Sequence, residues 1–358
     1  MQKTQEASKK HLFYLDSGNV VITSGYPPST LVEAYRLTCC SQSFGQSKID
    51  GVVISLRECT IPQFPNIRGL DVIGAVVGSK ILVCGGREAI VASTESDECF
   101  SLEPHDNQWQ LAGKMLTKRC NAAAVDFDGK LFIAGGRHTD NSIHLDSTEI
   151  VDLSSGFTTI YGPKLPHSLA LHCMVKLNST TAMIIGGFDG ATDVSSTYYF
   201  DFPSLTFTPG PNLQLKRKWM GCGILQNGQS GYVIVAGGES GSLYLASSEY
   251  LSLQSPVTWH SGTQSHLLNV SYLMHFLGPS FPLGYSRFRM VSGANYVLAF
   301  GGYDSAVRFT TIYKMVCLDE SSTLDLSCAW VKLDTELREA KDNPLPLLVP
   351  ENFVKCTF

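Results

Sequence analysis

Five short apolar runs that each end in a Gly-Gly doublet recur along the chain at nearly regular intervals. The doublets occupy 85–86, 135–136, 186–187, 237–238 and 301–302, with second glycines 50, 51, 51 and 64 residues apart. A degraded sixth copy, ITSG, occupies 22–25. Self-similarity at a fixed period indicates a repeat fold, in which each unit buries its apolar surface against its neighbours. The sequence therefore predicts a ring of about six small β-sheets.

Each copy reads as four short strands separated by turns, which is typical of a propeller blade. In the third copy the four segments are NAAAV, KLFIAGG, STEIVDL and FTTIY, within 121–161. A large aromatic residue occurs at the fourth strand of the copies with a full doublet; these residues are Trp109, Phe157, Phe207, Trp259 and Trp330. We expect the aromatic side chain to fill the wedge between neighbouring sheets. The glycines are expected where a Cβ would be crowded and the backbone dihedrals are unusual.

The doublet, the polar third strand and the outer aromatic together resemble the kelch repeat. The resemblance covers nearly the whole chain, although Ser24 replaces a glycine in the first copy. It implies an all-β fold: a single six-bladed β-propeller of four-stranded antiparallel blades over residues 1–358. The expected blades are 10–68, 69–117, 118–167, 168–216, 217–284 and 285–343, followed by a ring-closing segment at 344–358.

Two segments compete to supply the innermost strand of the first blade. One is HLFYL at 11–15, and the other lies in the tail, LREAKDNPLPLLVP at 337–350. We expect both to be ordered there, with the C-terminal segment as the closing strand.

Composition argues against several classes of partner. Charged residues are 16% of the chain, the net charge is −5, and the main basic cluster, LKRKW at 215–219, is expected on a solvated loop between blades. No apolar run reaches the ~18 residues of a membrane helix, and the N-terminus lacks the apolar core of a signal peptide. We therefore expect no nucleic-acid binding and no membrane span. The sequence leaves the oligomeric state open.

The eleven cysteines are scattered, without zinc spacing. Cys84, Cys173 and Cys222 fall on apolar inner strands, where we expect free thiols packing as small hydrophobes. This favours a cytoplasmic location. The sequons at Asn178 and Asn269 leave an extracellular location open if the chain is processed or internal to a longer protein.

Alternation along the strands places the loop after each doublet and the loop before each innermost strand on the same side of the ring. That side collects the residues Tyr26, Arg87, Phe188, Glu239, Tyr303, Arg119, Arg137, His172, Arg217 and Arg289. By resemblance to kelch propellers, Arg87, Arg119, Arg137 and Arg217 are the candidate partner-binding residues, because guanidinium groups recognise carboxylates bidentately. The alternative for each is a role in hydrogen bonds between blades or in surface ion pairs.

One interval is long and rich in Leu, Phe, Tyr and Met, at 261–288. Long loops in compact domains are frequently functional, so this loop is a candidate docking element or lid. Packing onto its own blade is the alternative.

Enzyme signatures are missing from the sequence. There is no GxSxG elbow, no GxGxxG or GxxxxGK[ST] phosphate loop, and no copper ligand set that we can place. We therefore predict no catalytic residues, no cofactor and no metal.

The sequence as a whole predicts a non-enzymatic protein-interaction module or scaffold. The kelch resemblance implies protein partners, with actin binding and cytoskeletal cross-linking among the roles. An extracellular glycosylated binding domain of a larger protein is the alternative, and an enzyme with its site in the central channel comes third.

Overall fold

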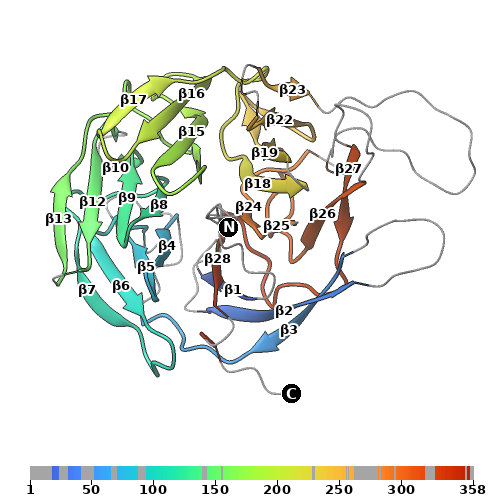
Figure 1. Ribbon diagram of the computed structural model, residues 1–358, viewed down its shortest axis with the longest axis horizontal. Coiled ribbons are helices and arrows are strands. Elements are labelled where there is room, and N and C mark those ends of the chain that lie inside the picture. Colours follow the sequence, from blue (N-terminus) through green and yellow to red (C-terminus); the bar gives the residue numbers. More distant parts are fainter. Residues whose placement is uncertain are drawn as a thin grey trace, which may run out of the picture.

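Six four-stranded antiparallel sheets stand around a central axis in the computed structural model (Figure 1). The structure describes residues 18–23, 31–41, 52–65, 71–87, 94–138, 143–154, 156–227, 230–254, 256, 258–261, 281, 284–293, 296–318, 327–350 and 353–354. No helix that could cross a bilayer occurs within these ranges. The all-β, six-bladed propeller expected from the repeat is therefore confirmed.

The blades use successive stretches of the chain, except the first. Blade 1 consists of β28 (Leu345–Val349), β1 (Gly18–Thr23), β2 (Glu33–Ser41) and β3 (Val52–Cys59). Blade 2 consists of β4 (Ile73–Val77), β5 (Lys80–Cys84), β6 (Glu98–Leu102) and β7 (Gln110–Lys114). Blade 3 consists of β8 (Ala123–Phe127), β9 (Lys130–Ala134), β12 (Thr148–Asp152) and β13 (Thr158–Tyr161).

The second half of the ring repeats the pattern. Blade 4 consists of β14 (Cys173–Lys176), β15 (Thr181–Phe188), β16 (Asp193–Asp201) and β17 (Thr206–Pro209). Blade 5 consists of β18 (Gly221–Asn227), β19 (Ser230–Ala236), β22 (Ser248–Ser252) and β23 (His260–Ser261). Blade 6 consists of β24 (Arg289–Ser292), β25 (Val297–Phe300), β26 (Ile312–Leu318) and β27 (Ser327–Lys332). Two short flaps follow the doublets of blades 3 and 5: β10 (Arg137–His138) with β11 (Ile143–His144), and β20 (Glu239–Ser240) with β21 (Leu243–Tyr244).

The hydrophobic core lies between blades rather than within them. Each cluster of buried apolar side chains draws on two neighbouring sheets. Between blades 3 and 4, for example, the ring of Phe132 stacks on Phe200 with centroids 4.0 Å apart. A single blade has no core of its own, so the closed ring is the unit of stability.

The outer aromatic residues occupy the wedges between blades, as expected. Trp109 and Trp259 are buried, and each indole Nε1 donates to a proline carbonyl of the preceding blade, Pro62 at 3.0 Å and Pro211 at 2.9 Å. Phe157 packs against the position of Gly113 on the last strand of blade 2. These aromatic residues therefore join the blades at their outer edges.

The Gly-Gly doublets join the blades at their inner edges. In blade 2 the N–H of Gly86 donates to the carbonyl of Arg119 at the start of blade 3, 3.0 Å away. Both glycines have positive φ, 65° at Gly85 and 78° at Gly86, and a Cβ on Gly85 would lie 2.5 Å from that same carbonyl oxygen. Glycine is required because only it adopts this conformation at no steric cost and lets the next blade approach so closely.

The same bond recurs at every doublet that the structure describes. In the remaining four copies the second glycine donates to the next blade across 2.7–2.8 Å, in the pairs Gly136–Leu169, Gly187–Arg217, Gly238–Tyr285 and Gly302–Lys341. The doublet is therefore a joint between blades.

The ring is closed by the C-terminal segment. Strand β28 pairs antiparallel with β1 as the innermost strand of blade 1, with Val349 opposite Asn19 and Leu345 opposite Thr23. Leu347 and Val349 are buried in the cluster that blades 1 and 2 share. The competing segment at 11–15 lies outside the described residues.

The cysteines correct one expectation. Cys84 and Cys99, directly opposite one another on β5 and β6 with Cα atoms 4.0 Å apart, form a disulfide, and so do Cys173 and Cys222, with Cα atoms 6.1 Å apart. Cys84, Cys173 and Cys222 are therefore not free thiols. The second bond links the innermost strands of blades 4 and 5, because positions one repeat apart face each other across neighbouring blades.

Substituting a doublet glycine tests the joint. We expect Gly85→Ala to destabilise the protein by more than Gly78→Ala, which has a similar φ of 62° but nothing within 4 Å of its Cβ position. The left-handed conformation costs about 1–2 kcal/mol at either site, and overpacking against the Arg119 carbonyl adds about 1–3 kcal/mol at Gly85 alone. Urea denaturation of both variants measures the difference, and equal losses would contradict the joint.

Removing the closing strand tests the ring. Deletion of 344–358 removes β28 and leaves β1 unpaired on one edge, so we expect the cooperative unfolding transition to disappear. A synthetic peptide of residues 344–358 added in trans should restore it. An unchanged melting temperature in the truncated chain would show that β28 does not close the fold.

Candidate binding face

The loops after the doublets and the loops before the innermost strands meet on one side of the ring, which we call the doublet face. Isolated β-bridges join the two kinds of loop in blades 3 to 6, in the pairs Cys120–Arg137, Ala170–Phe188, Lys218–Glu239 and Ser286–Tyr303. The opposite side, the hairpin face, carries the turns between the first two strands of each blade, such as Asp128–Gly129. Residues near each doublet are thus brought close to the ring axis on the doublet face.

A ring of backbone hydrogen bonds surrounds the channel mouth on this face. The residue two positions before each innermost strand has positive φ. These six residues are Asp71, Asn121, Leu171, Trp219, Arg287 and Asn343. From Asn121 onward, the N–H of each donates to the carbonyl of its counterpart in the preceding blade. The last link, from Asn343 back to blade 2, uses side chains, because its Nδ2 donates to Oδ1 of Asp71 at 2.6 Å.

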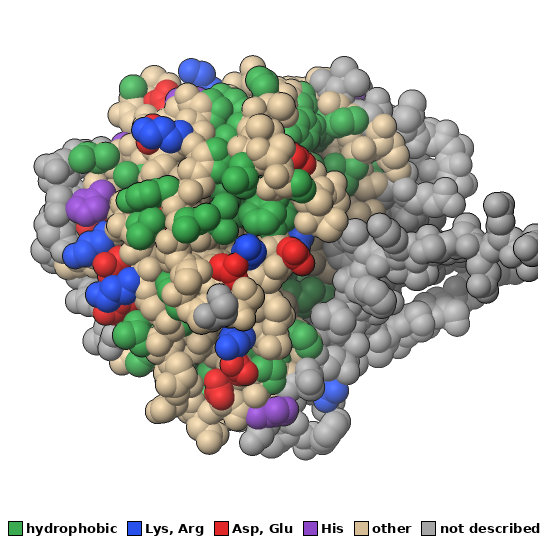
Figure 2. Space-filling view, turned by 60° about the vertical axis from the view of Figure 1, so that its left-hand side comes forward, with side chains coloured by type: hydrophobic (Ala, Val, Ile, Leu, Met, Phe, Trp, Pro, Cys, Tyr) green, Lys and Arg blue, Asp and Glu red, His purple; other side chains and the backbone are tan. Residues whose placement is uncertain are grey.

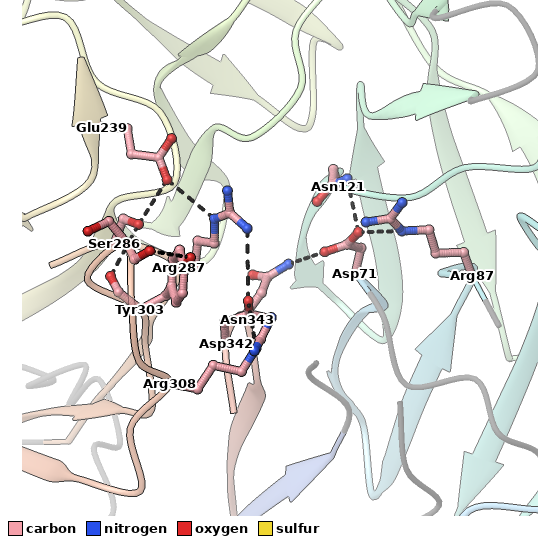
Figure 3. A network of polar contacts seen from close by, with 11 residues as sticks. Asp71, Arg87, Asn121, Glu239, Ser286, Arg287, Tyr303, Arg308, Asp342 and Asn343 are labelled. Atoms are coloured by element: carbon pink, nitrogen blue, oxygen red, sulfur yellow. Dashed lines mark hydrogen bonds and ion pairs between the residues drawn. The ribbon is translucent and has the colours of Figure 1, made fainter. Parts of the chain in front are cut away.

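Asp71 organises one side of the mouth (Figure 3). Its carboxylate is buried and accepts from Arg87 Nε at 2.9 Å, Asn121 Nδ2 at 3.2 Å and Asn343 Nδ2 at 2.6 Å. Asn343 in turn accepts from Arg289 Nε at 2.7 Å. This network joins blades 1, 2, 3 and 6 and fixes the side chains that it contains.

A second network forms the other side of the mouth (Figure 3). The carboxylate of Glu239 accepts from the hydroxyl of Ser286 at 2.9 Å and from Arg287 Nε at 3.3 Å, and Arg308 lies 3.4 Å from Asp342. The Arg287 guanidinium also lies over the rings of Trp219 and Tyr303, 5.1 and 5.3 Å from their centroids. Blades 5 and 6 thus present stacked aromatic and cationic groups.

Arg119 and Arg217, two of the four arginines predicted from sequence, are completely buried. Arg119 donates to Glu149 at 2.5 Å and to the carbonyls of Gly135 and Ser147, while Glu149 also accepts from two backbone N–H groups at 116 and 117. Burial lowers the pKa of Arg119 from its ordinary value, and the charge of Glu149 opposes that shift.

Arg217, two blades further along the chain, has the same environment. It donates to Glu249 at 3.0 Å and to the carbonyls of Gly237 and Ser247, each at 2.8 Å. Burial again lowers its pKa, opposed by Glu249. Both arginines brace the doublet of their own blade from inside, so neither is available to a partner, and both are removed from the candidate face.

Arg87 and Arg137 remain on the doublet face, partly buried. The Nε of Arg87 is held by Asp71. Arg137 opens the flap β10–β11, and its guanidinium has no acceptor among the residues that the structure describes; its Nε is buried without a hydrogen-bond partner. Arg137 is therefore the arginine of the original four that is free to bind a carboxylate.

The basic cluster at 215–219 does not form a basic patch. Arg217 is buried, and Lys218 pairs with Asp193 at 3.0 Å and lies over the Phe188 ring. On the side that Figure 2 shows, Lys and Arg side chains lie beside Asp and Glu side chains rather than gathering by sign. Only part of the cluster is therefore solvated, contrary to the expectation for Arg217.

Of the other residues expected on this face, Glu239 and Tyr303 join the second network and His172 is buried. Tyr26 and nearly all of the 261–288 loop lie outside the described residues. The sequence did not single out Arg287, Arg308 or Trp219. Trp219 and Arg287 lie two residues before an innermost strand, and this position becomes informative only once the ring of residues with positive φ is known. Among the described residues, no group of three or more His, Cys, Asp or Glu side chains is arranged to hold a metal ion.

Comparisons with known proteins agree with this architecture. No family model matches the sequence. A stretch of 75 residues is 33% identical to kelch-like protein 33 of Homo sapiens and covers 21% of this chain and 14% of that protein. A stretch of 120 residues is 28% identical to spermatocyte protein spe-26 of Caenorhabditis elegans and covers 32% and 20%, respectively. The matched stretches thus span no more than a fifth of either relative.

The solved structure of YjhT superimposes with a TM-score of 0.65, covering 88% of this chain and 95% of that chain at 13% identity, which establishes a shared fold. Six four-stranded blades in a closed ring define the class: a six-bladed β-propeller. The in-phase doublets and the match to kelch-like protein 33 support a kelch-repeat β-propeller. The kelch match and the fold support a protein-interaction module.

Removing a buried arginine should separate structural from surface roles. We expect Arg217→Met to cost about 3–5 kcal/mol, because it leaves the Glu249 carboxylate buried without its counter-charge. Arg137→Met removes the same charge but leaves no buried carboxylate unpaired, so it should change the free energy of unfolding by less than about 0.5 kcal/mol. Chemical denaturation measures both. A negligible loss in Arg217→Met would contradict the bracing role.

Proposed function

We propose that the protein is a non-enzymatic binding module whose doublet face captures a carboxylate-bearing segment of a protein partner. The observation that carries this proposal is the unpaired guanidinium of Arg137 beside the flap of blade 3. A guanidinium recognises a carboxylate through two parallel hydrogen bonds, and such charge-assisted bonds are the strong ones. An arginine that forms no internal ion pair can make those bonds without breaking others.

Exposed apolar side chains on the same face support a protein partner. Three large apolar residues project from the loops after the doublets of blades 3, 5 and 6: Ile143, Leu243 and Val307 are 47%, 66% and 54% exposed. Aromatic and arginine residues are enriched in binding hot spots, and Trp219, Arg287 and Tyr303 lie together at the mouth. A rigid ring that carries such loops can vary its specificity without altering its core.

Capture of partners from the native source tests this face. We expect Arg137→Met to lose partners that the wild-type protein retains, whereas Lys130→Met should retain them. Lys130 carries the same charge in the same blade but lies at the hairpin face, so it is the matched control. Quantitative mass spectrometry of the captured proteins measures the difference. Identical partner sets for wild type and Arg137→Met would overturn the choice of face.

Actin is the specific partner that we propose to test first, since the kelch resemblance implies it. Co-sedimentation with filaments should pellet the wild-type protein and not Arg137→Met. If neither pellets, the cytoskeletal role is removed while a different protein partner stays proposed.

A second candidate is favoured by the disulfides. Besides the Cys84–Cys99 and Cys173–Cys222 bonds, Cys59 and Cys328 are disulfide-bonded. Disulfides persist mainly in oxidising compartments, which supports an extracellular binding domain in place of the cytoplasmic module. Asn178, whose sequon lies on an exposed turn, is a site for a glycan in that case. Thiol counting on native protein decides between the two, because full alkylation without reductant would exclude the oxidised form.

A further inference from the structure

A cavity of about 340 Å³ lies along the ring axis, walled by the innermost strands of all six blades. Its walls are mostly small or apolar side chains, such as Ala123, Val291 and Leu347. Among the described residues that line it, three are charged: Asp126, Lys176 and Arg289. Cavities of this volume, with apolar walls and a few polar groups, are typical of small-molecule sites.

Arg289 is the charged group that the channel leaves unbalanced. Asp126 and Lys176 pair with one another at 2.7 Å. Arg289 donates through Nε to Asn343, and its two terminal nitrogens have no acceptor among the described residues. Asp71, the carboxylate that acts on Arg289 through space, already accepts bonds at both of its oxygens.

A second unsatisfied side chain lies beside Arg289. His172 is 2% exposed, neither of its ring nitrogens has a hydrogen-bond partner, and it borders a hollow of about 10 Å³ behind Arg289 rather than the channel cavity itself. Burial lowers the pKa of His172 to about 3, and the charge of Arg289 adds to that shift, so the imidazole is neutral at neutral pH. A neutral imidazole has one N–H to donate.

Arg289 keeps its charge, because a guanidinium does not lose its proton in proteins, and its two terminal nitrogens are donors suited to a carboxylate. We propose that the channel binds a small carboxylate with an apolar body. The carboxylate is held by the terminal nitrogens of Arg289, and the apolar body lies along the inner strands. A second cavity of about 570 Å³, lined by Lys176, Asn178 and Ser179, shares several wall residues with the first and supplies the entrance from the hairpin face.

This site is separate from the proposed capture of a partner on the doublet face. It depends on Arg289, not on Arg137. Failure of one proposal therefore leaves the other intact.

Arginine labelling on the wild-type protein tests the site without any substitution. Phenylglyoxal modification of Arg289, followed by mass spectrometry of peptides, should slow in a saturable manner as benzoate is added. Benzamide, which has the same shape without the charge, should give no protection, and modification of Arg338, an exposed arginine that does not line the cavity, should be unaffected by either compound. Equal protection by benzamide, or none by benzoate, would overturn the proposal.

Ligand-observed NMR then assigns the residues. We expect Arg289→Gln to weaken benzoate binding about 10- to 100-fold, as the loss of charge-assisted hydrogen bonds implies. Lys130→Met, which removes a positive charge that pairs with Asp152 and does not line the cavity, should leave benzoate binding unchanged. Unchanged affinity in Arg289→Gln would contradict the assignment. Protection of Arg289 by an acetylated, glutamate-containing hexapeptide but not by benzoate would assign the channel to a peptide and overturn the proposal as stated.

Discussion

The hydrogen bond from the second glycine of each doublet to a carbonyl of the next blade is the constraint on which the ring depends. It requires positive φ at both glycines and leaves no room for a Cβ at the first, as at Gly85. The carbonyl that accepts it lies two residues before the positive-φ position of the next blade, as Arg119 does before Asn121. Each joint therefore also positions a residue of the channel mouth.

This arrangement divides the arginines of the doublet face by depth. Those at the carbonyl position of the joint, Arg119 and Arg217, turn inward onto a buried glutamate and brace the doublet. Those directly after a doublet, Arg87 and Arg137, stay nearer the surface. Lys341 and Tyr285 occupy the inner position in blades 1 and 6, where each also bonds to backbone carbonyls. The inner position is thus structural whichever residue fills it.

Much of the fold followed from the sequence, because period and doublets are local and repeated. The blade number, the four-stranded sheets and the aromatic residues between blades, such as Trp109 and Trp259, were all predicted. The depth of Arg119 and Arg217 was not, because arginine serves equally as a buried brace and as a surface group. A usable signal was present: each arginine precedes, by 30 or 32 residues, a glutamate at the same position of the third strand.

The Cys173–Cys222 disulfide and the place of Arg289 on the channel wall depend on the closed ring, which explains why the sequence alone did not predict them. Cys173 and Cys222 are 49 residues apart, and only the ring places one repeat against the next. The sequence predicted Arg289 on the doublet face, but its position on the channel wall depends on where β24 lies relative to the five other innermost strands. Contacts between residues of different blades leave no local pattern in the sequence from which they could be predicted.

Binding on the doublet face, at loops that the glycine joints hold in place, can be tested by hydrogen–deuterium exchange of the propeller, free and bound to a captured partner. We expect protection on binding in the segments after the doublets, above all at 137–138 and 143–144 with the neighbouring mouth residues. Protection confined to the hairpin turns or to the outermost strands, with the doublet face unchanged, would contradict it.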